Sequence, residues 1–393
     1  MGSINIDNTG SGGGVTLSSD GTDLLLDGSA IGGGGGGGAD LYAANESSPS
    51  AQPSATGANA VAIGDSAVAS GADALAFGDG ATSSSTRSTA IGYNPTASGI
   101  NSVAIGPNAN SSNFYTVAIG SPSNGAGSVA TSAFSAIAIN GYASGTDSLA
   151  AAIASNSSSY GASGANSIAM GRLSKTSGAD GISIGDNNIV SNSKGIALGS
   201  SHSISGVSGY AIGDSHTVSG FGAACIGGST SAATQTYAMT FGPYAKAAVQ
   251  NAFIFGSKGW FSAGSAQGGM YILYADTTDA TAEALTTTNS TAGSTNQIVA
   301  ANDTCITFDG TITAMQNGAQ AYASWKIEGL LVNDGGTTTL ANSATTVIQN
   351  SSGWGMALSA DNTNNALAIT CTGEAAHNIR WVANIRTTEV TYA

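Results

Sequence analysis

The chain has 393 residues, 57 of them glycine, and only 8% of its residues are charged while 41% are hydrophobic. Its 9 basic and 23 acidic side chains give a net charge of −14, which disfavours nucleic acid as a partner. It contains no apolar run of roughly 18 residues, so membrane insertion through a spanning helix is excluded.

Residues 1–27 are polar and contain two short strand-like pieces, "SINID" and "VTLSS" with "DLLLDG". Residues 28–54 follow with seven consecutive glycines, Gly32 to Gly38, and then Pro49 and Pro53. Glycine-rich chain is flexible, and proline stiffens it. The first 54 residues are therefore predicted to be a small arm, 1–27, and a linker, 28–54.

A repeat of 14 residues occupies residues 55–258. Each unit has the form "apolar, small, apolar, Gly", as in "NSVAIG". After one longer step the phase returns at Asn140 and then at Ala154, and a second longer step leads to Gly171. Fixed-period similarity indicates a repeat architecture, and this period fits two short strands and two tight corners. The corner glycines are Gly64, Gly78, Gly92, Gly106, Gly120, Gly171, Gly185, Gly199, Gly213, Gly227, Gly242 and Gly256. The sequence predicts about fourteen stacked turns, a rod of roughly 65 Å.

The large apolar residues one and three positions before each glycine alternate with a small residue, as expected for a strand. We expect these large residues to fill the lumen of the rod. The lumen candidates are Val61, Ile63, Val103, Ile105, Ile182 and Ile184. A single coil buries little surface, so identical chains are expected to associate along the rod, with three as the natural number.

Residues 259–393 follow a different pattern. Runs such as "TCITFDGTITAM" and "AYASWKIEGLLV" alternate and are separated by Asn, Asp and Gly turns at irregular intervals. This spacing predicts an antiparallel β-sandwich of the jelly-roll kind. The whole chain is thus predicted to be all-β.

The repeat "NSVAIG", with "GANAVAIG" and "GANSIAMG", resembles the left-handed parallel β-roll heads of trimeric autotransporter adhesins, the YadA type. The resemblance covers about residues 55–258 and implies a homotrimer with the "VAIG" strands nearest the threefold axis. The chain has no recognisable secretion signal or outer-membrane anchor, which argues for a virion fibre assembled in the host cytoplasm and not secreted by a signal peptide.

The two ends of the chain also resemble phage proteins. The opening "GSINIDNTGSGGG" and the closing stretch from "ASWKIEGLLVNDGG" to "IRTTEV" are similar to fibre proteins of marine tailed bacteriophages. The resemblance implies a fibre, a tail fibre first of all, that binds other virion proteins through residues 1–27 and a host surface glycan or protein through the C-terminal domain. The alternatives are a head decoration or spacer fibre without a receptor, and a bacterial trimeric adhesin.

Aromatic and amide side chains of the last domain are the candidates for receptor contact. Trp325 and Trp381 lie within strand patterns and are expected in the core, whereas Trp354 follows "NSSG" and precedes "SADNTNN". The candidate contacts are Trp354, Asp361, Asn362, Asn364 and Asn365. The alternative for these residues is core or trimer packing.

Catalytic, metal and cofactor sites are not expected. Glycosidases need two carboxylates about 5 to 9.5 Å apart, and the acidic residues here are scattered through turns. Cys225, Cys305 and Cys371 have no metal-ligand spacing and are expected to be small buried thiols, with a Cys305–Cys371 disulfide as the alternative. His202 and His216 lie one turn apart. They are expected to form a polar ladder that satisfies backbone groups, and the alternative is a site for an ion.

Overall fold

The computed structural model describes residues 51–120, 134–152, 159–260, 262–318 and 320–392 with their side chains. It describes the backbone alone for strands at 4–6, 15–19, 24–26, 29–30 and 129–130. These ranges contain strands and no helix, which confirms the all-β class. Nothing in them has the helical length and apolarity that a membrane span requires.

The N-terminal arm forms a small antiparallel sheet. Its strands β1 (Ile4–Ile6), β2 (Val15–Ser19), β3 (Leu24–Leu26) and β4 (Ser29–Ala30) pair in chain order. The sequence predicted two strand-like pieces here, and β4 falls in the predicted linker. The glycine run Gly32 to Gly38 lies outside the described residues.

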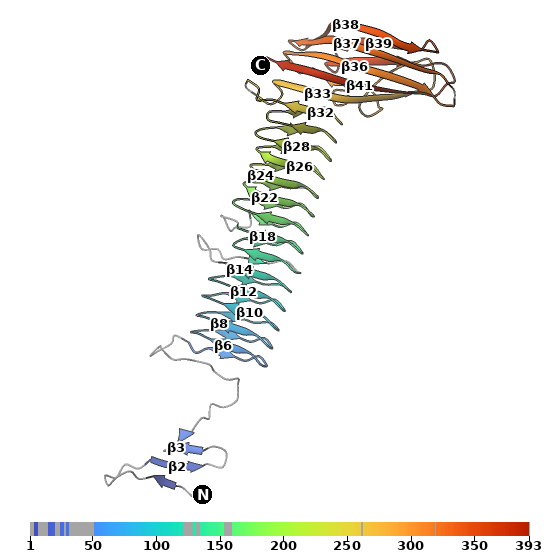
Figure 1. The fold of residues 1–393 in the computed structure, drawn as a ribbon. Helices are drawn as coiled ribbons and strands as arrows, with labels where there is room; N and C mark the ends of the chain where they lie inside the picture. The colour runs from blue at the N-terminus through green and yellow to red at the C-terminus, as the bar shows by residue number, and fades with distance from the viewer. Residues whose placement is uncertain are drawn as a thin grey trace.

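The repeats form a rod of stacked turns, each of which gives one strand to each of two parallel sheets (Figure 1). The first sheet consists of β6 (Val61–Ile63), β8 (Leu75–Phe77), β10 (Thr89–Ile91), β12 (Val103–Ile105), β14 (Val117–Ile119), β16 (Ile137–Ile139), β18 (Leu149–Ala151), β20 (Ile168–Met170), β22 (Ile182–Asp186), β24 (Ile196–Ser200), β26 (Tyr210–Asp214), β28 (Ala224–Gly227), β30 (Met239–Phe241) and β32 (Phe253–Gly256). The second sheet consists of β5 (Ser54–Ala55), β7 (Val68–Ala69), β9 (Thr82–Ser83), β11 (Thr96–Ala97), β13 (Asn110–Ser111), β15 (Val129–Ala130), β17 (Tyr142–Ala143), β19 (Gly161–Ala162), β21 (Lys175–Thr176), β23 (Ile189–Val190), β25 (Ser203–Ile204), β27 (Thr217–Val218), β29 (Ala232–Ala233) and β31 (Lys246–Ala247). Equivalent residues of successive turns pair with each other, so the stacking keeps one register.

The corners need unusual backbone geometry. Gly64 has a φ of 121°, and a Cβ there would lie 2.6 Å from the carbonyl carbon of Gly78 in the next turn. Eleven of the twelve predicted corner glycines have positive φ, while Gly256 ends β32, where the chain leaves the roll. Asn140 replaces glycine at one corner with a φ of 44°, and Ala152, which follows β18 with a φ of 56°, forms the next corner. The prediction that Ala154 marks this corner is therefore wrong, and Ala154 itself lies outside the described residues.

Small residues line the interior of the roll. Ala104, in the middle of β12, is fully buried, as are Ala90 and Ala118, its partners in the neighbouring turns. The prediction that the large apolar residues fill the lumen is wrong: the side chains of Val61, Ile63, Val103, Ile105, Ile182 and Ile184 are half-buried or exposed. A three-residue strand sends its middle residue to one face and its outer two to the other, and the narrow interior accepts the small middle residue.

The C-terminal domain is an antiparallel sandwich with one core. Its larger sheet has the order β33 (Ala266–Thr277), β41 (Ile379–Thr391), β36 (Thr304–Gln316), β37 (Tyr322–Asp334) and β38 (Thr337–Asn350). The smaller sheet contains β34 (Ala282–Ala284), β35 (Ile298–Val299), β39 (Gly355–Asp361) and β40 (Ala366–Thr372). The predicted sandwich is confirmed, although β36, β37 and β38 form a meander instead of alternating between sheets as in a jelly roll.

Buried side chains from both sheets form the core of this domain. Trp325 and Trp381 stack with ring centroids 5.6 Å apart and are almost fully buried, which confirms their predicted place in the core. Leu367 and Ile369 of β40 belong to the same apolar cluster. The two sheets are therefore held together by one continuous apolar interior.

The first sheet of the roll continues into this domain. Strand β32 pairs antiparallel with β33 from Phe253 opposite Met270 to Gly256 opposite Gln267. The remainder of β33, through Thr277, runs beyond the width of the shaft (Figure 1). One face of the long sheet is thereby continuous with the outer face of the roll.

Candidate functional site

The outer face of the first sheet carries two columns of large apolar side chains. One column runs through equivalent positions from Ile63 to Phe255, the other from Val61 to Phe253. Many of these side chains are 36–50% exposed, among them Phe77, Ile184 and Phe255. We call these two columns the outer stripe. An exposed apolar patch of this length marks an interaction surface.

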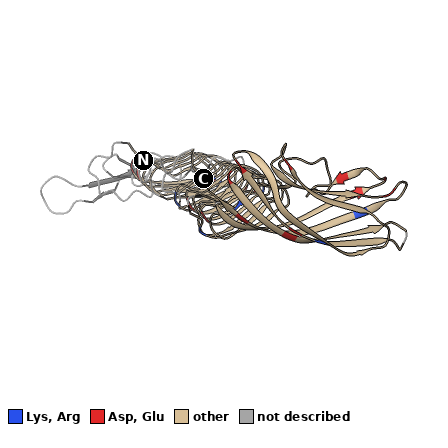
Figure 2. Ribbon diagram, turned by 90° about the horizontal axis from the view of Figure 1, so that it is seen from above, with Lys and Arg blue, Asp and Glu red and all other residues tan. Residues whose placement is uncertain are grey.

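The second sheet has no comparable stripe among the described residues. Its outward positions are mostly polar or small, such as Thr82, Thr96 and Ser203. The larger exceptions are Val68, Tyr142 and Ile189. The two sheets of one turn therefore differ strongly in outward chemistry. Only 8% of the residues are charged, and most of the ribbon in Figure 2 is tan. The outer stripe is therefore the main apolar feature of the shaft.

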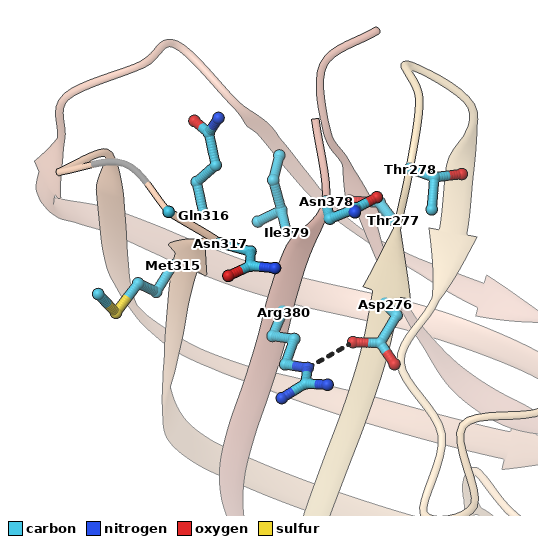
Figure 3. Close-up of a pocket in the computed structure, with 10 residues that line it drawn as sticks. Asp276, Thr277, Thr278, Met315, Gln316, Asn317, Asn378, Ile379 and Arg380 are labelled. Carbon is cyan, nitrogen blue, oxygen red and sulfur yellow. Dashed lines mark ion pairs between the residues drawn. The ribbon is translucent and has the colours of Figure 1, made fainter. Parts of the chain in front are cut away.

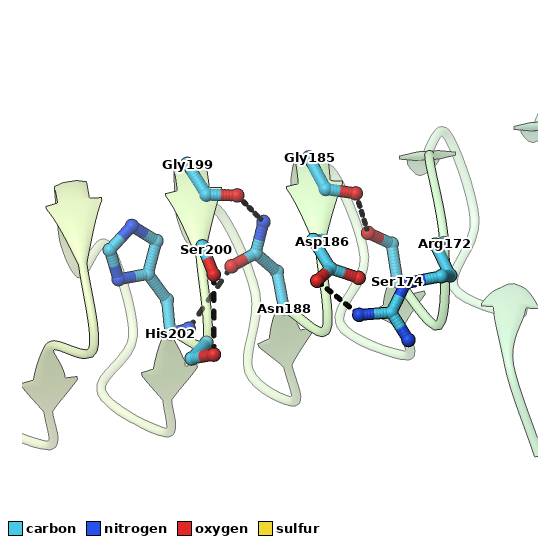
Figure 4. Close-up of polar contacts among 9 residues, drawn as sticks. Arg172, Ser174, Gly185, Asp186, Asn188, Gly199, Ser200 and His202 are labelled. Carbon is cyan, nitrogen blue, oxygen red and sulfur yellow. Dashed lines mark hydrogen bonds and ion pairs between the residues drawn. The ribbon is translucent and has the colours of Figure 1, made fainter.

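A polar ladder runs through the interior behind the corner glycines. It consists of Ser174, Asn188, His202, His216 and Ser231, each in a successive turn and each buried. The His202 backbone N–H donates to Asn188 Oδ1 over 3.0 Å, as Figure 4 shows. The His216 N–H donates to His202 Nδ1, and the Ser231 N–H donates to His216 Nδ1, both over 3.2 Å.

The other side of the ladder contacts backbone carbonyls. Asn188 Nδ2 donates to Gly199 O over 2.9 Å, and His216 Nε2 lies 2.9 Å from Gly227 O. Because each Nδ1 accepts a backbone N–H, the proton of each neutral imidazole must sit on Nε2. Both ring nitrogens of His216 are thus engaged by the protein itself.

The two imidazoles stack with centroids 5.1 Å apart and an interplanar angle of 11°. Their arrangement satisfies buried backbone groups, as the ladder interpretation of the sequence predicted. It leaves no Nδ1 lone pair free for an ion. Burial lowers the pKa of His202, and the charge of His216 acts in the same direction. The described residues contain no group of three His, Cys, Asp or Glu side chains placed to hold a metal ion.

The three thiols are free. Cys225 and Cys371 are buried, and burial raises their pKa to about 11 and about 12. Cys305 is half-buried and is not bonded to Cys371. The expectation of small buried thiols therefore holds for Cys225 and Cys371, and both are poor nucleophiles.

A buried carboxyl group lies where the roll meets the sandwich. Glu389 of β41 accepts hydrogen bonds from Gln267 (2.9 Å), Thr387 (2.7 Å) and Tyr271 (3.3 Å). Burial raises its pKa despite these three donors. No local sequence pattern indicates this cluster, because its members are up to 122 residues apart.

The predicted receptor contacts make contacts within the domain. Trp354 is only 4% exposed and lies 5.8 Å from Trp381, so the prediction that it faces a receptor is wrong. Asp361 accepts hydrogen bonds from the backbone of Thr363 and from Asn364, whose amide nitrogen is 2.7 Å away.

The other two predicted contacts hold β38. Asn362 Oδ1 accepts the Thr338 N–H over 2.7 Å, and Asn365 Oδ1 accepts the Thr338 hydroxyl over 3.2 Å. Turns select Asn and Asp because their side chains bond nearby backbone groups. Asn362 and Asn365 therefore join this turn to β38, and the role of the amide cluster in hydroxyl recognition stays a prediction.

The opposite end of the sandwich contains a cleft of about 570 Å³ (Figure 3). Its walls come from the ends of β33, β36 and β41 and their loops. The lining residues are Asp276, Thr277, Thr278, Met315, Gln316, Asn317, Gly318, Asn378, Ile379 and Arg380. The volume is within the range of ligand-binding clefts.

Comparison with protein families identifies the repeats. The YadA head domain repeat matches residues 55–81, 69–94, 97–121 and 162–188. The shaft is a YadA-like β-roll. The matched residues contain seven of the fourteen strands that carry the outer stripe, and such repeats indicate an adhesin-like fibre. Comparison with curated proteins gave no match.

Proposed function

We propose that the chain forms a homotrimeric attachment fibre of a bacteriophage particle. The observation that supports the trimer is the outer stripe. The first sheet has two columns of apolar side chains, and the described part of the second sheet has no such column. Exposed apolar surface along a whole rod is covered by equal stripes of identical chains, and closed symmetry is the usual outcome. The YadA-like repeats support the same arrangement.

In this fibre the three parts of the chain have separate roles. The roll is a spacer whose length is set by the number of turns. The sandwich is held beyond the roll by β33, at the opposite end of the chain from the N-terminal strands (Figure 1). The N-terminal arm binds other proteins of the particle, and the sandwich contacts the host surface.

The phage assignment is supported by the resemblance of both ends of the sequence to phage fibre proteins. A tail fibre is the first choice, and a head decoration or spacer fibre without a receptor is the alternative. A bacterial adhesin shares the YadA-like repeats and differs in where the fibre is attached. The location of the N-terminal arm separates these possibilities.

Two measurements test the proposal. The mass of the full chain in solution should be three times 38.0 kDa, and a fragment of residues 54–258 should also be trimeric at micromolar concentration. Deletion of residues 1–30 should leave a folded trimer that no longer joins phage particles. A monomeric fragment would contradict the trimer, and a truncated chain that still joins the particle would contradict the role of the arm.

A further inference from the structure

Four exposed side chains form a straight row across the far end of the larger sheet. Asp276 of β33 is paired with Arg380 of β41, Arg380 with Met315 of β36, and Met315 with Tyr322 of β37. Residues paired in this way point to the same face. With strands about 4.8 Å apart, the row is about 14 Å long. We call these four residues the tip row.

The tip row combines three kinds of chemistry on one surface. Arg380 Nε lies 3.3 Å from Asp276 Oδ1, and both side chains remain more than half exposed. Met315 is 62% exposed and Tyr322 is 51% exposed, at the ends of β36 and β37. An ion pair thus lies at one end of the row and an open aromatic ring at the other.

The cleft borders the tip row and adds amide groups. Gln316, Asn317 and Asn378 line it (Figure 3). The Asn317 N–H donates to the Asn378 carbonyl over 2.9 Å, so the two loops that carry these amides are joined. A fixed backbone holds the amide groups in place before a ligand arrives, which lowers the entropy cost of binding.

The floor of the cleft is rigid. Trp381 Nε1 donates to Thr277 Oγ1 over 3.0 Å, and both residues are buried. The ring centroids of Trp354 and Trp381 are 5.8 Å apart. The tryptophan that the sequence indicated as a contact therefore packs in the core next to Trp381.

The tip row lies on the face that continues the outer face of the roll, but beyond the roll itself. Met270 is the last residue of β33 that pairs with the roll, and Asp276 lies six residues farther along the strand. At about 3.3 Å per residue this is about 20 Å. Association of the roll through its outer stripe therefore leaves the tip row outside the paired strands of the shaft.

We propose that the tip row and the cleft beside it bind a neutral oligosaccharide of the host surface; this rests on the proposed attachment function. A paired carboxylate and guanidinium, together with amides, donate and accept hydrogen bonds to neighbouring hydroxyls. The Tyr322 ring and the Met315 thioether offer the apolar surface on which a sugar ring lies. The chain's net charge of −14 opposes acidic saccharides.

The experiment measures binding of the full-length fibre to immobilised neutral hexose oligosaccharides and, separately, to sialylated ones. Tyr322→Ala and Arg380→Gln should each weaken binding to the neutral saccharides about tenfold or more. Tyr93→Ala and Arg172→Gln are matched controls on the roll, where Tyr93 is 54% exposed and Arg172 pairs with Asp186. The controls should bind as the unmodified fibre does.

Several results would overturn the inference. Equal binding by the tip-row variants and the controls would place the saccharide elsewhere and leave the attachment function intact. Binding only to sialylated saccharides would refute the ligand class, and dissociation of the trimer by Tyr322→Ala would assign the tip row to a subunit interface. A fibre that binds cells but no saccharide would overturn the inference alone, whereas a fibre that binds neither would also refute the proposed function.

Discussion

Ile184 and Ile189 lie in the same turn on opposite sheets and offer a direct test of the outer stripe. Ile184 is 40% exposed on the first sheet, and Ile189 is 41% exposed on the second. Complete burial of an isoleucine contributes about 1.5–3 kcal/mol. Covering the exposed 40% of Ile184 in a trimer would thus contribute about 0.6–1.2 kcal/mol per chain, or about 2–4 kcal/mol for three chains.

Ile184→Asp removes this contribution and places three carboxylates near one another. An unpaired charge taken out of water costs several kcal/mol more. We therefore expect the association constant to fall more than about a thousandfold, while each chain keeps its β-structure because position 184 does not face the lumen. Ile189→Asp should leave the trimer intact.

The assay is sedimentation velocity across a dilution series, with circular dichroism on the same samples. The expected result is dissociation of the Ile184→Asp fibre at concentrations where the Ile189→Asp fibre remains trimeric. Two equally stable trimers would refute the assignment of the stripe. Dissociation of the Ile189→Asp fibre alone would move the interface to the second sheet.

Other changes test the interior and the junction. Ala104→Leu overfills the lumen and should destabilise the roll by about 1–3 kcal/mol, whereas Ile105→Leu should leave its stability unchanged. Equal melting temperatures of the two variants would contradict the orientation of these strands. Because burial lowers the pKa of His202 from its ordinary 6.5, its contribution to stability is complete above pH 6.5 and declines as the pH falls toward the folded-state pKa. His202→Asn should therefore reduce the loss of melting temperature between pH 7 and pH 5, and an unchanged loss would assign it to other groups. Burial raises the pKa of Glu389 from 4.5, so the stability of the fold falls as the pH rises through the folded-state pKa. Glu389→Gln should therefore raise the melting temperature at pH 8 by about 2–4 °C, which corresponds to a gain of about 1 kcal/mol. An unchanged melting temperature at pH 8 would contradict this prediction.

The repeat itself was predictable because every turn obeys the same local rule. A glycine at the corner and alternating residues before it define a strand and a turn without any distant contact. Alternation does not show which residues of the strand face the lumen, because the pattern is the same whether the large or the small residues point inward. The signal that distinguishes them is the middle position, which is alanine in ten of the fourteen turns, among them Ala62, Ala76, Ala90 and Ala104. A position that is nearly always small is a crowded one.

The tip row could not be predicted from the sequence. Its four members come from four strands, and only the pairing of β33, β41, β36 and β37 brings them together. The stretch "SADNTNN" resembled a polar binding loop, but the same residue types satisfy turns. Ladder residues His202 and His216 were placed correctly one turn apart because the period fixes that spacing.

The stacking of the turns also determines how the shaft responds to force. Hydrogen bonds between successive turns point along the rod, so a pull on the tip loads them one after another in series. Each turn contributes only two short paired segments to resist that pull, and the first turn to open would let the rest of one chain unravel. Three chains joined side by side would share the tension, so the outer stripe would give the fibre tensile strength that a single coil lacks.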